Sequence, residues 1–321
     1  MKMKKPVMVI AILLPLMMLL LTTPTKAENS KPIIVCTTSA IGSLVEEYVG
    51  DSADVVVLVQ PGLCPADFDM KPSDIYAVSN ARILFKQNIQ GEFWLEGLIE
   101  AAGNSDLTQV AIPGAYNTPE GARNYITWVG GNLSEILGIN LDTKIAAMLA
   151  DVDEVSNWMA SQSQALQASS VKVICMNWLR TFVESVGFQV VDTYNPPETL
   201  SAGDITTLIN TAQSEGVALI VDNLQIDVEF GKGIATEVGA EHVVLTNFPG
   251  AIPGTGSLTE MFRYNAAQLF NATITWRSTT TLRTELEDSK NQVTTYQTTT
   301  SLAVIIAIAE AVWLYIGKKR P

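Results

Sequence analysis

Histidine is almost absent from this chain of 321 residues, which contains only His242. Catalytic triads and most general acid–base sites are built around an imidazole, and a single histidine at the start of a predicted strand offers no such set. The glycine-rich segment 248–257 lacks the lysine of a phosphate-binding loop and the spacing of a dinucleotide-binding loop. The sequence therefore predicts neither an enzyme nor an organic cofactor.

Positive charge is also scarce, with 20 lysines and arginines against 33 aspartates and glutamates and a net charge of −13. The basic residues are concentrated at the two ends, so residues 28–300 hold 13 basic against 32 acidic side chains. A body with a net charge of −19 repels nucleic acid and anionic lipid headgroups. A nucleic-acid function is excluded, whereas cationic solutes are compatible with this surface.

Cysteine is limited to Cys36, Cys64 and Cys175, which are too few for a disulfide scaffold and leave at least one thiol free. Two short triplets of the form Asn-X-Ser/Thr are present. They make Asn132 and Asn271 candidate glycosylation sites.

Long apolar runs occur only at the two ends of the chain. Lysines precede the first run, and small and polar residues follow it, so residues 1–27 are predicted to be a signal peptide. Residues 301–317 are predicted to be a transmembrane helix followed by a basic cytoplasmic tail, 318–321. The positive-inside rule then predicts a single-pass protein of the cell membrane with its bulk outside and its C-terminus in the cytoplasm. A carboxyl group inside a membrane is costly, so Glu310 indicates a partner helix.

Between the ends, short β-branched runs alternate with segments of helical spacing. This alternation predicts parallel sheets that are covered by helices on both faces. We therefore predict an α/β fold of two parallel-sheet lobes, 28–140 and 169–275, joined by a single long helix at 141–168. The threonine-rich segment 276–300 carries a thin apolar stripe and is predicted to be a stalk, either helical or flexible.

The loop at residues 61–74 follows the second predicted strand, and such loops bind ligands in parallel α/β sheets. Its framework resembles the corresponding loop of the solute-binding proteins of zinc and manganese ABC importers. The matching framework residues are Gly62, Pro65, Phe68, Asp69, Pro72, Ser73 and Asp74. Residues 258–265 are similar to the C-terminal helix of that family, and the order of lobe, long helix and lobe also agrees. The resemblance implies a rigid receptor that holds a metal between two lobes and delivers it to an ABC permease and its ATPase.

The sequence departs from that family at the metal ligands. The family's three histidines fall on Ala66, Gly114 and Asn177, and its late aspartate falls on Asn247. A zinc or manganese site built from imidazoles and carboxylates cannot be assembled from these four side chains. The usual site is therefore absent, and a bound metal ion of another kind is left open.

Three kinds of replacement site are compatible with the sequence. Sulfur ligands would select a soft ion such as Cu(I), and oxygen ligands would suit a harder cation. The candidate sulfur ligands are Cys36, Cys64, Cys175 and Met70. The candidate oxygen ligands are Asn177, Asn247, Asp67, Asp69, Asp192 and Asp222. A neutral, amide-lined cleft flanked by Phe68, Trp178 and Phe248 would instead suit an organic or chelated solute.

The sequence thus predicts a membrane-anchored extracytoplasmic solute-binding protein of an ABC importer, which captures a metal ion or metal chelate between two lobes. The alternative is a receptor-shaped surface protein that binds a non-metal organic molecule or acts as a scaffold or adhesin. Cysteine, methionine and aromatic side chains most often fill protein cores, so their burial decides between these hypotheses.

Overall fold

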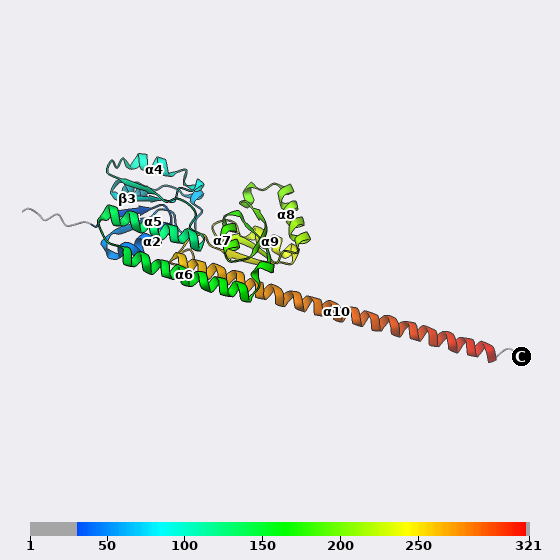
Figure 1. Cartoon of the computed structure of the whole chain (residues 1–321). Helices are drawn as coiled ribbons and strands as arrows, with labels where there is room; N and C mark the ends of the chain where they lie inside the picture. The colour runs from blue at the N-terminus through cyan, green and yellow to red at the C-terminus, as the bar shows by residue number, and fades with distance from the viewer. Residues whose placement is uncertain (1–30, 319–321) are drawn as a thin grey trace, which may run out of the picture.

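A computed structural model describes residues 31–318, so the predicted signal peptide and residues 319–321 lie outside the described part of the chain. Within that part, eight strands form two four-stranded parallel sheets (Figure 1). The first sheet has the strand order β2-β1-β3-β4, and the second has the equivalent order β6-β5-β7-β8. The predicted α/β fold of two parallel-sheet lobes, a long linking helix and a C-terminal helix is confirmed.

The strands and helices of the first lobe, in chain order, are β1 (Ile33–Cys36), α2 (Ser39–Val49), β2 (Asp54–Val57), α3 (Pro72–Ser79), β3 (Ala81–Lys86), α4 (Leu95–Ala102), β4 (Thr108–Ala111) and α5 (Pro119–Leu137). The linking helix is α6 (Asp142–Ala165). The second lobe and the helix that follows it consist of β5 (Lys172–Met176), α7 (Arg180–Ser185), β6 (Gln189–Tyr194), α8 (Ala202–Glu215), β7 (Leu219–Asn223), α9 (Glu229–Val238), β8 (Glu241–Leu245) and α10 (Leu258–Lys318).

The central strands of the first sheet are buried on both faces, because alternate side chains of a strand point to opposite sides. Val35 and Leu84 pack on one side with residues of α3 and α4. Ile34, Cys36 and Phe85 pack on the other side with residues of α2 and α5. Helices on both faces explain why β1 and the middle of β3, residues 83–85, are apolar without interruption.

The two lobes share one core, which runs through α6 and the first turns of α10. Figure 1 shows these two helices side by side beneath both lobes. The Trp158 ring of α6 meets the Phe270 ring of α10 edge-on, with centroids 5.8 Å apart. Arg263 of α10 lies over the Trp158 ring and donates a hydrogen bond to Glu154 at 2.9 Å. The linking helix is thus braced by a second helix, which limits the freedom of the lobes to move apart.

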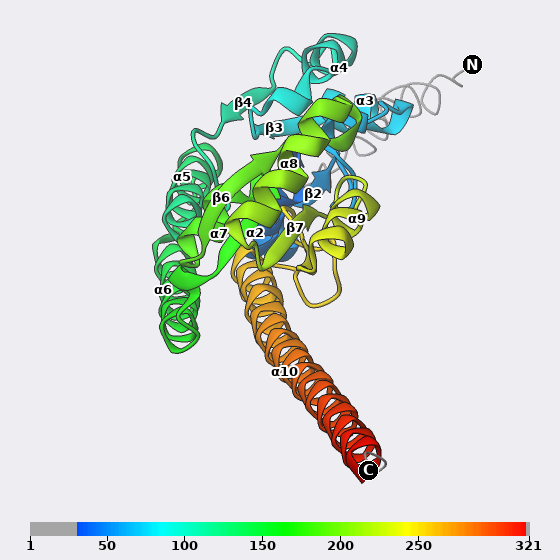
Figure 2. The ribbon, with the colours of Figure 1, turned by 90° about the vertical axis from the view of Figure 1, so that its right-hand side faces the viewer.

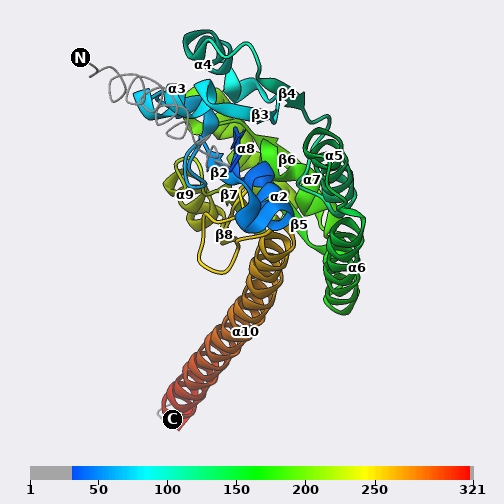
Figure 3. The same ribbon diagram turned by 90° about the vertical axis from the view of Figure 1, so that its left-hand side faces the viewer.

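Helix α10 continues without interruption from Leu258 to Lys318, so the predicted stalk is helical rather than flexible. Figures 2 and 3 show it leaving the lobes as a single rod. Its many threonines remain helical because their hydroxyls donate to carbonyl groups one turn earlier, as Thr294 does to Lys290 at 2.9 Å. Within residues 31–318, it is the one helix that is long and apolar enough, by length and composition, to cross a membrane.

The single histidine belongs to a buried network in the second sheet. The carboxylate of Asp222 lies 2.6 Å from His242 Nε2 and accepts a hydrogen bond from the Tyr194 hydroxyl. Burial, together with the neighbouring Asp222 charge, raises the pKa of Tyr194 far above its usual range, so the phenol remains a donor. Helix α9 passes close by, and a Cβ atom on Gly231 would lie 2.6 Å from the Asp222 carboxyl carbon.

Gly231→Ala is expected to lower the free energy of unfolding by about 1–3 kcal/mol, because its methyl group would collide with the fixed Asp222 carboxylate. Gly233 in the same helix is the matched control, since a Cβ atom there would meet nothing within 4 Å. Gly233→Ala should raise the free energy of unfolding by about 0.5–1 kcal/mol. Urea unfolding followed by circular dichroism measures both values, and equal stabilities of the two variants would contradict the close packing of α9 on Asp222.

Candidate functional site

The candidate site lies where the loops at the carboxyl ends of the two sheets meet, which is the usual position of ligands in parallel α/β sheets. We use the name inter-lobe cleft for this region of contact between the lobes, which includes Ser39, Tyr116, Asn117, Gln225 and Asn247. It is formed by the loops after β1 to β4 in the first lobe and after β5, β7 and β8 in the second. Side chains from these loops reach directly from one lobe to the other.

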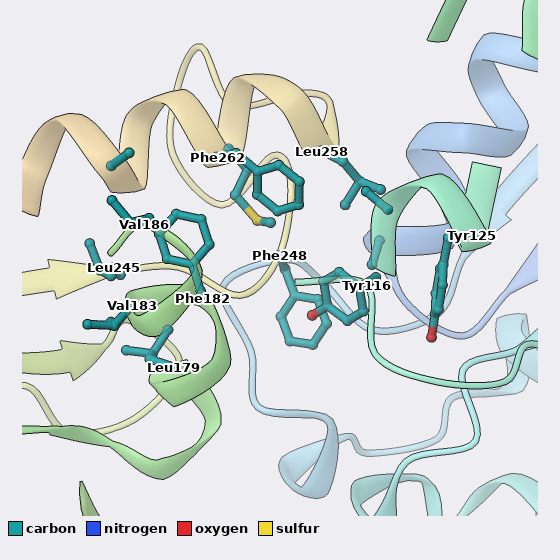
Figure 4. Packing of buried hydrophobic residues seen from close by; sticks show 14 of the residues in the cluster. Tyr116, Tyr125, Leu179, Phe182, Val183, Val186, Leu245, Phe248, Leu258 and Phe262 are labelled. Carbon is teal, nitrogen blue, oxygen red and sulfur yellow. The ribbon is translucent and has the colours of Figure 1, made fainter. Parts of the chain in front are cut away.

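Tyr116, in the loop after β4, makes the most buried of these contacts. Its hydroxyl donates a hydrogen bond to the Asn247 carbonyl at 2.6 Å, and its ring stacks on Phe248 with centroids 6.2 Å apart (Figure 4). Burial raises the pKa of Tyr116 far above its usual range, so the hydroxyl remains a neutral donor. The two lobes are therefore joined here through a contact from which water is excluded.

Other neutral side chains make similar bonds across the cleft. Three of them donate to main-chain carbonyl groups of the opposite lobe: Ser39 to Pro249 at 2.7 Å, Gln225 to Pro61 at 2.8 Å and Asn117 to Trp178 at 3.0 Å. Neutral hydrogen bonds to main-chain carbonyl groups each stabilise by about 0.5–1.5 kcal/mol. The contacts between the lobes thus depend on shape and hydrogen bonding rather than on charge.

The four positions that the resemblance assigns to the family's metal ligands carry no ionisable side chain. Ala66 and Asn177 are exposed in the loops after β2 and β5, and Asn247 is buried after β8. Gly114 has a φ of +84°, a conformation that favours glycine over a bulky ligand, and its carbonyl accepts a hydrogen bond from Tyr125 at 3.0 Å. These residues offer amide and main-chain oxygens in place of imidazole nitrogens.

The three thiols are not brought together. Cys36 and Cys175 are fully buried on β1 and β5, which belong to different sheets, while Cys64 is buried in the loop after β2. Burial raises the pKa of Cys175 to about 12 and also raises the pKa values of Cys36 and Cys64, whereas a metal binds the thiolate form. Met70 lies apart from the thiols on the surface, 39% exposed. Within residues 31–318, no three His, Cys, Asp or Glu side chains are grouped to hold a metal ion.

The carboxylates considered as oxygen ligands are also dispersed. Asp222 is bound by His242 and Tyr194 within the second sheet. Asp192 is half-buried, and its carboxylate accepts the main-chain N–H of the next residue at 2.8 Å. Asp67 and Asp69 are exposed in the loop after β2. A hard cation therefore finds no ready group of carboxylates among the described residues.

Sequence reasoning missed Glu92, which lies shortly after β3. Apart from Asp222, it is the only carboxylic acid that is buried within residues 31–318. Its Oε2 accepts the main-chain N–H groups of Asn88 and Ile89 at 2.6 and 3.4 Å. Its Oε1 is buried without a hydrogen-bond partner. Burial raises the pKa of Glu92, and hydrogen bonds from the Thr37 hydroxyl and from main-chain N–H groups oppose that rise.

The turn that carries Glu92 packs against the turn that carries Ala66. A Cβ atom on Gly91 would lie 3.1 Å from the Ala66 nitrogen, and the Trp94 indole donates to the Pro65 carbonyl at 2.8 Å. Glu92 therefore places a carboxyl group next to the loop where the resembled family carries its first histidine. No motif marks this residue, and only its position at the carboxyl edge of the first sheet could have indicated it.

The sequence matches the family described as zinc-uptake complex component A, periplasmic, over residues 34–272. The chain belongs to this family. It is therefore an extracytoplasmic solute-binding protein rather than an enzyme, and its family acts with the permease and ATPase of ABC importers.

Several relatives share the fold at low sequence identity. The manganese-binding lipoprotein MntA of Halalkalibacterium halodurans is 23% identical over 267 residues, which cover 76% of this chain and 89% of MntA. The crystal structure of ZnuA has a TM-score of 0.64 at 21% identity, and the match covers 76% of this chain and 100% of that one. The periplasmic zinc-binding protein TroA of Treponema pallidum has a TM-score of 0.66 at 15% identity, with 76% and 99% covered. The Ni²⁺ complex of FpvC from P. aeruginosa has a TM-score of 0.65 at 14% identity, with 76% and 97% covered.

Glu92→Gln is expected to raise the melting temperature by a few degrees at pH 7.5 and to leave it nearly unchanged at pH 4. Burial in the folded state raises the pKa of Glu92 above its unfolded value of about 4.3. The contribution of Glu92 to the stability of the fold is therefore complete below the unfolded pKa and is lost as the pH rises through the folded pKa. Glutamine retains the acceptor for Asn88 and carries no charge. Thermal unfolding across this pH range measures the effect.

Glu100→Gln, on the exposed surface of α4, is the control and should change the melting temperature equally at both pH values. If the gain in melting temperature from Glu92→Gln does not increase with pH, burial does not destabilise the charged form of Glu92.

Proposed function

We propose that this chain is a membrane-anchored receptor of an ABC importer whose cargo is a metal complex, with most of the metal's ligands supplied by the complex itself. The donor set of the inter-lobe cleft carries this proposal. Ala66, Gly114, Asn177 and Asn247 stand in place of imidazoles and a carboxylate within a frame that belongs to the family. A bare Zn²⁺ or Mn²⁺ ion would find only neutral amides and the carboxyl group of Glu92, which are too few and too weak.

The side chains around the cleft fit the periphery of a chelate. Trp178 is 43% exposed beside the bond from Asn117 that joins the lobes, and its indole offers an aromatic face. Asn177 next to it offers an exposed amide. Pockets with a few polar groups and aromatic walls bind organic surfaces rather than bare ions. Glu92 and the net charge of −19 on residues 28–300 favour a complex that carries positive charge.

The long helix α10 supports attachment to a membrane. Residues 276–300 form an exposed helical stalk that spans roughly 37 Å at 1.5 Å per residue. The apolar segment 301–317 follows, and by the positive-inside rule Lys318, Lys319 and Arg320 favour a cytoplasmic C-terminus. The stalk would hold the lobes above the membrane, within reach of a permease.

The alternative is a receptor-shaped surface protein that binds a non-metal organic molecule or acts as a scaffold or adhesin. The neutral hydrogen bonds between the lobes favour it, because they suit an uncharged ligand as well as they suit a chelate. The two functions differ in whether a metal accompanies the ligand.

The full chain, extracted in mild detergent and purified without chelator, is the sample for native mass spectrometry and elemental analysis. We expect one metal per chain together with the mass of an organic ligand. An organic mass without metal would contradict the metal complex and favour the alternative. A metal without organic mass that is lost in the Cys64→Ser/Cys175→Ser double variant would contradict the proposal and establish a sulfur site.

Trp178→Ala is expected to weaken binding of the complex by roughly twofold to tenfold and so to lower its occupancy, because an aromatic contact is worth about 0.5–1.5 kcal/mol. Trp128→Ala is the matched control, since Trp128 is 47% exposed on α5, away from the loops that form the cleft. Elemental analysis of the two variants measures occupancy. Equal metal content in both variants would place the cargo away from Trp178.

A further inference from the structure

A stripe of apolar side chains runs along the part of α10 that extends beyond the lobes. Leu282, Leu286, Val293 and Tyr296 are 65%, 55%, 54% and 71% exposed. Their spacings of four, seven and three residues follow the heptad repeat of a coiled coil. Large apolar side chains that are exposed at this spacing indicate a helix that pairs with another helix.

The heptad register places the stripe at the a and d positions. The residues at these positions are Leu282, Leu286, Ser289, Val293 and Tyr296. Glu285 then occupies a g position, and Lys290 occupies the e position of the next heptad. In a parallel two-stranded coiled coil, a g residue of one helix lies beside the following e residue of the other. Glu285 of each copy would therefore meet Lys290 of the other copy, which gives two ion pairs per dimer.

The antiparallel arrangement is disfavoured by the same residues. It places e positions of the two helices side by side, so that Arg283 and Lys290 would repel each other. Two chains inserted in one membrane with the same orientation also point their helices in the same direction. The charges and the geometry thus agree on a parallel pair.

The same register continues into the apolar segment. From Thr300 onward its a and d positions are Thr300, Ala303, Ala307, Glu310, Leu314 and Gly317. The other faces carry large exposed side chains such as Leu302, Ile305 and Trp313, which suit contact with lipid. Small residues allow two helices to approach closely in a membrane, and a carboxyl group there needs a hydrogen-bonding partner. One continuous face therefore combines heptad apolar residues, small residues and Glu310.

We propose that α10 pairs with α10 of a second copy of this chain as a parallel two-stranded coiled coil that continues into the membrane. The inference rests on the membrane anchorage put forward under the proposed function. A heptad segment this short is marginally stable in water, and co-insertion in one membrane raises the effective concentration of the partner helix. Arg283 donates a hydrogen bond to the Gly239 carbonyl at 3.3 Å, so the second lobe still contacts α10 at this residue. The proposed coiled coil therefore starts at Leu286, the next apolar residue of the stripe.

The consequence is that two receptors stand side by side at the same height above the membrane. Each stalk is stiffened by the other, and the two inter-lobe clefts are held at a fixed distance from the bilayer. A pair of receptors raises the local concentration of loaded cargo near one permease.

Disulfide cross-linking of the full chain in native membranes tests the pairing. Val293→Cys, at an a position, is expected to give a disulfide-linked dimer under mild oxidation. Asn291→Cys, at the outer f position of the preceding heptad, is the matched control and should remain monomeric. The unmodified chain gives the baseline, because its three cysteines are buried. Equal cross-linking of the two variants, or none in either, would overturn the proposal.

Charge reversal in the Val293→Cys background tests the parallel register. Glu285→Lys is expected to lower the dimer yield by roughly threefold to tenfold, because it replaces two attractive pairs with two repulsive ones. Adding Lys290→Glu should restore the yield, since the pair is then reversed rather than broken. A double variant that cross-links no better than Glu285→Lys alone would rule out this register.

The result is separable from that of the proposed function. If the chain sediments with membranes and carries its cargo while Val293→Cys stays monomeric, the pairing is wrong and the receptor function stands. If Val293→Cys dimerises but no cargo is found, the pairing stands and the receptor function is wrong. A chain that does not sediment with membranes would contradict both the anchorage and the pairing that depends on it.

Discussion

The first turns of α10 are buried beneath the lobes, against α6 and the second sheet, and this burial fixes where the rest of the helix leaves the lobes. Leu258, Met261, Phe262 and Leu269 are at most 2% exposed, and Phe262 stacks on Phe182 of α7 with ring centroids 5.7 Å apart. Figure 4 shows this pair beside the contact of Tyr116 with Phe248. Because the same helix continues as the stalk, one continuous helix runs from the core to Lys318.

The way the lobes are joined bears on how the receptor would take up cargo. The lobes are joined on one side by α6 and α10 and on the other by hydrogen bonds across the inter-lobe cleft. Hinge closure needs a few loop or terminal residues that absorb large changes in φ and ψ, whereas packed helices such as α6 and α10 permit only small sliding movements. A cargo would therefore enter by displacing a few neutral contacts, each worth about 1 kcal/mol, rather than by driving a large closure.

The chemistry of the cleft separates this chain from relatives that share its frame. The two-lobed fold depends on apolar packing that many sequences can supply. A metal site instead needs several ligands of particular residue types at particular positions. This chain has the fold of its relatives, while the positions that the resemblance assigns to the donors carry neutral residues. Glu92 is the one buried carboxyl group near the loops of the first lobe, and its second oxygen has no partner among the described residues.

Much of the fold could be predicted from local patterns. Alternating β-branched runs indicated the parallel sheets, and Thr118 caps α5 by accepting the Gly121 N–H at 3.0 Å, as expected for a threonine before a proline. Strand β4 was missed because, of its four residues, only Val110 is buried. The framework of the loop 61–74 and the helix at 258–265 indicated the family, which the match over residues 34–272 confirms.

The contacts that define the site could not be found in this way. Tyr116 and Asn247 are 131 residues apart in the chain, and nothing in the local sequence of either residue indicates that they meet. For Cys36 and Cys175 the local sequence was misleading instead. Each residue lies near the end of a predicted strand and was a candidate metal ligand, but the alternation of side chains along the strand points both into the core. Both the contact of Tyr116 with Asn247 and the burial of the two cysteines depend on how distant segments of the chain pack together.

The most direct test of the central claim is calorimetric titration of the metal-free full chain with Zn²⁺, beside a variant that restores the family's donors. We expect no stoichiometric high-affinity binding by the unmodified chain. The triple variant Ala66→His/Asn177→His/Asn247→Asp should bind one Zn²⁺ per chain, because the frame is that of the family and only the donors differ. Tight one-to-one binding of Zn²⁺ by the unmodified chain would contradict the claim that its cleft has lost the site for a bare ion.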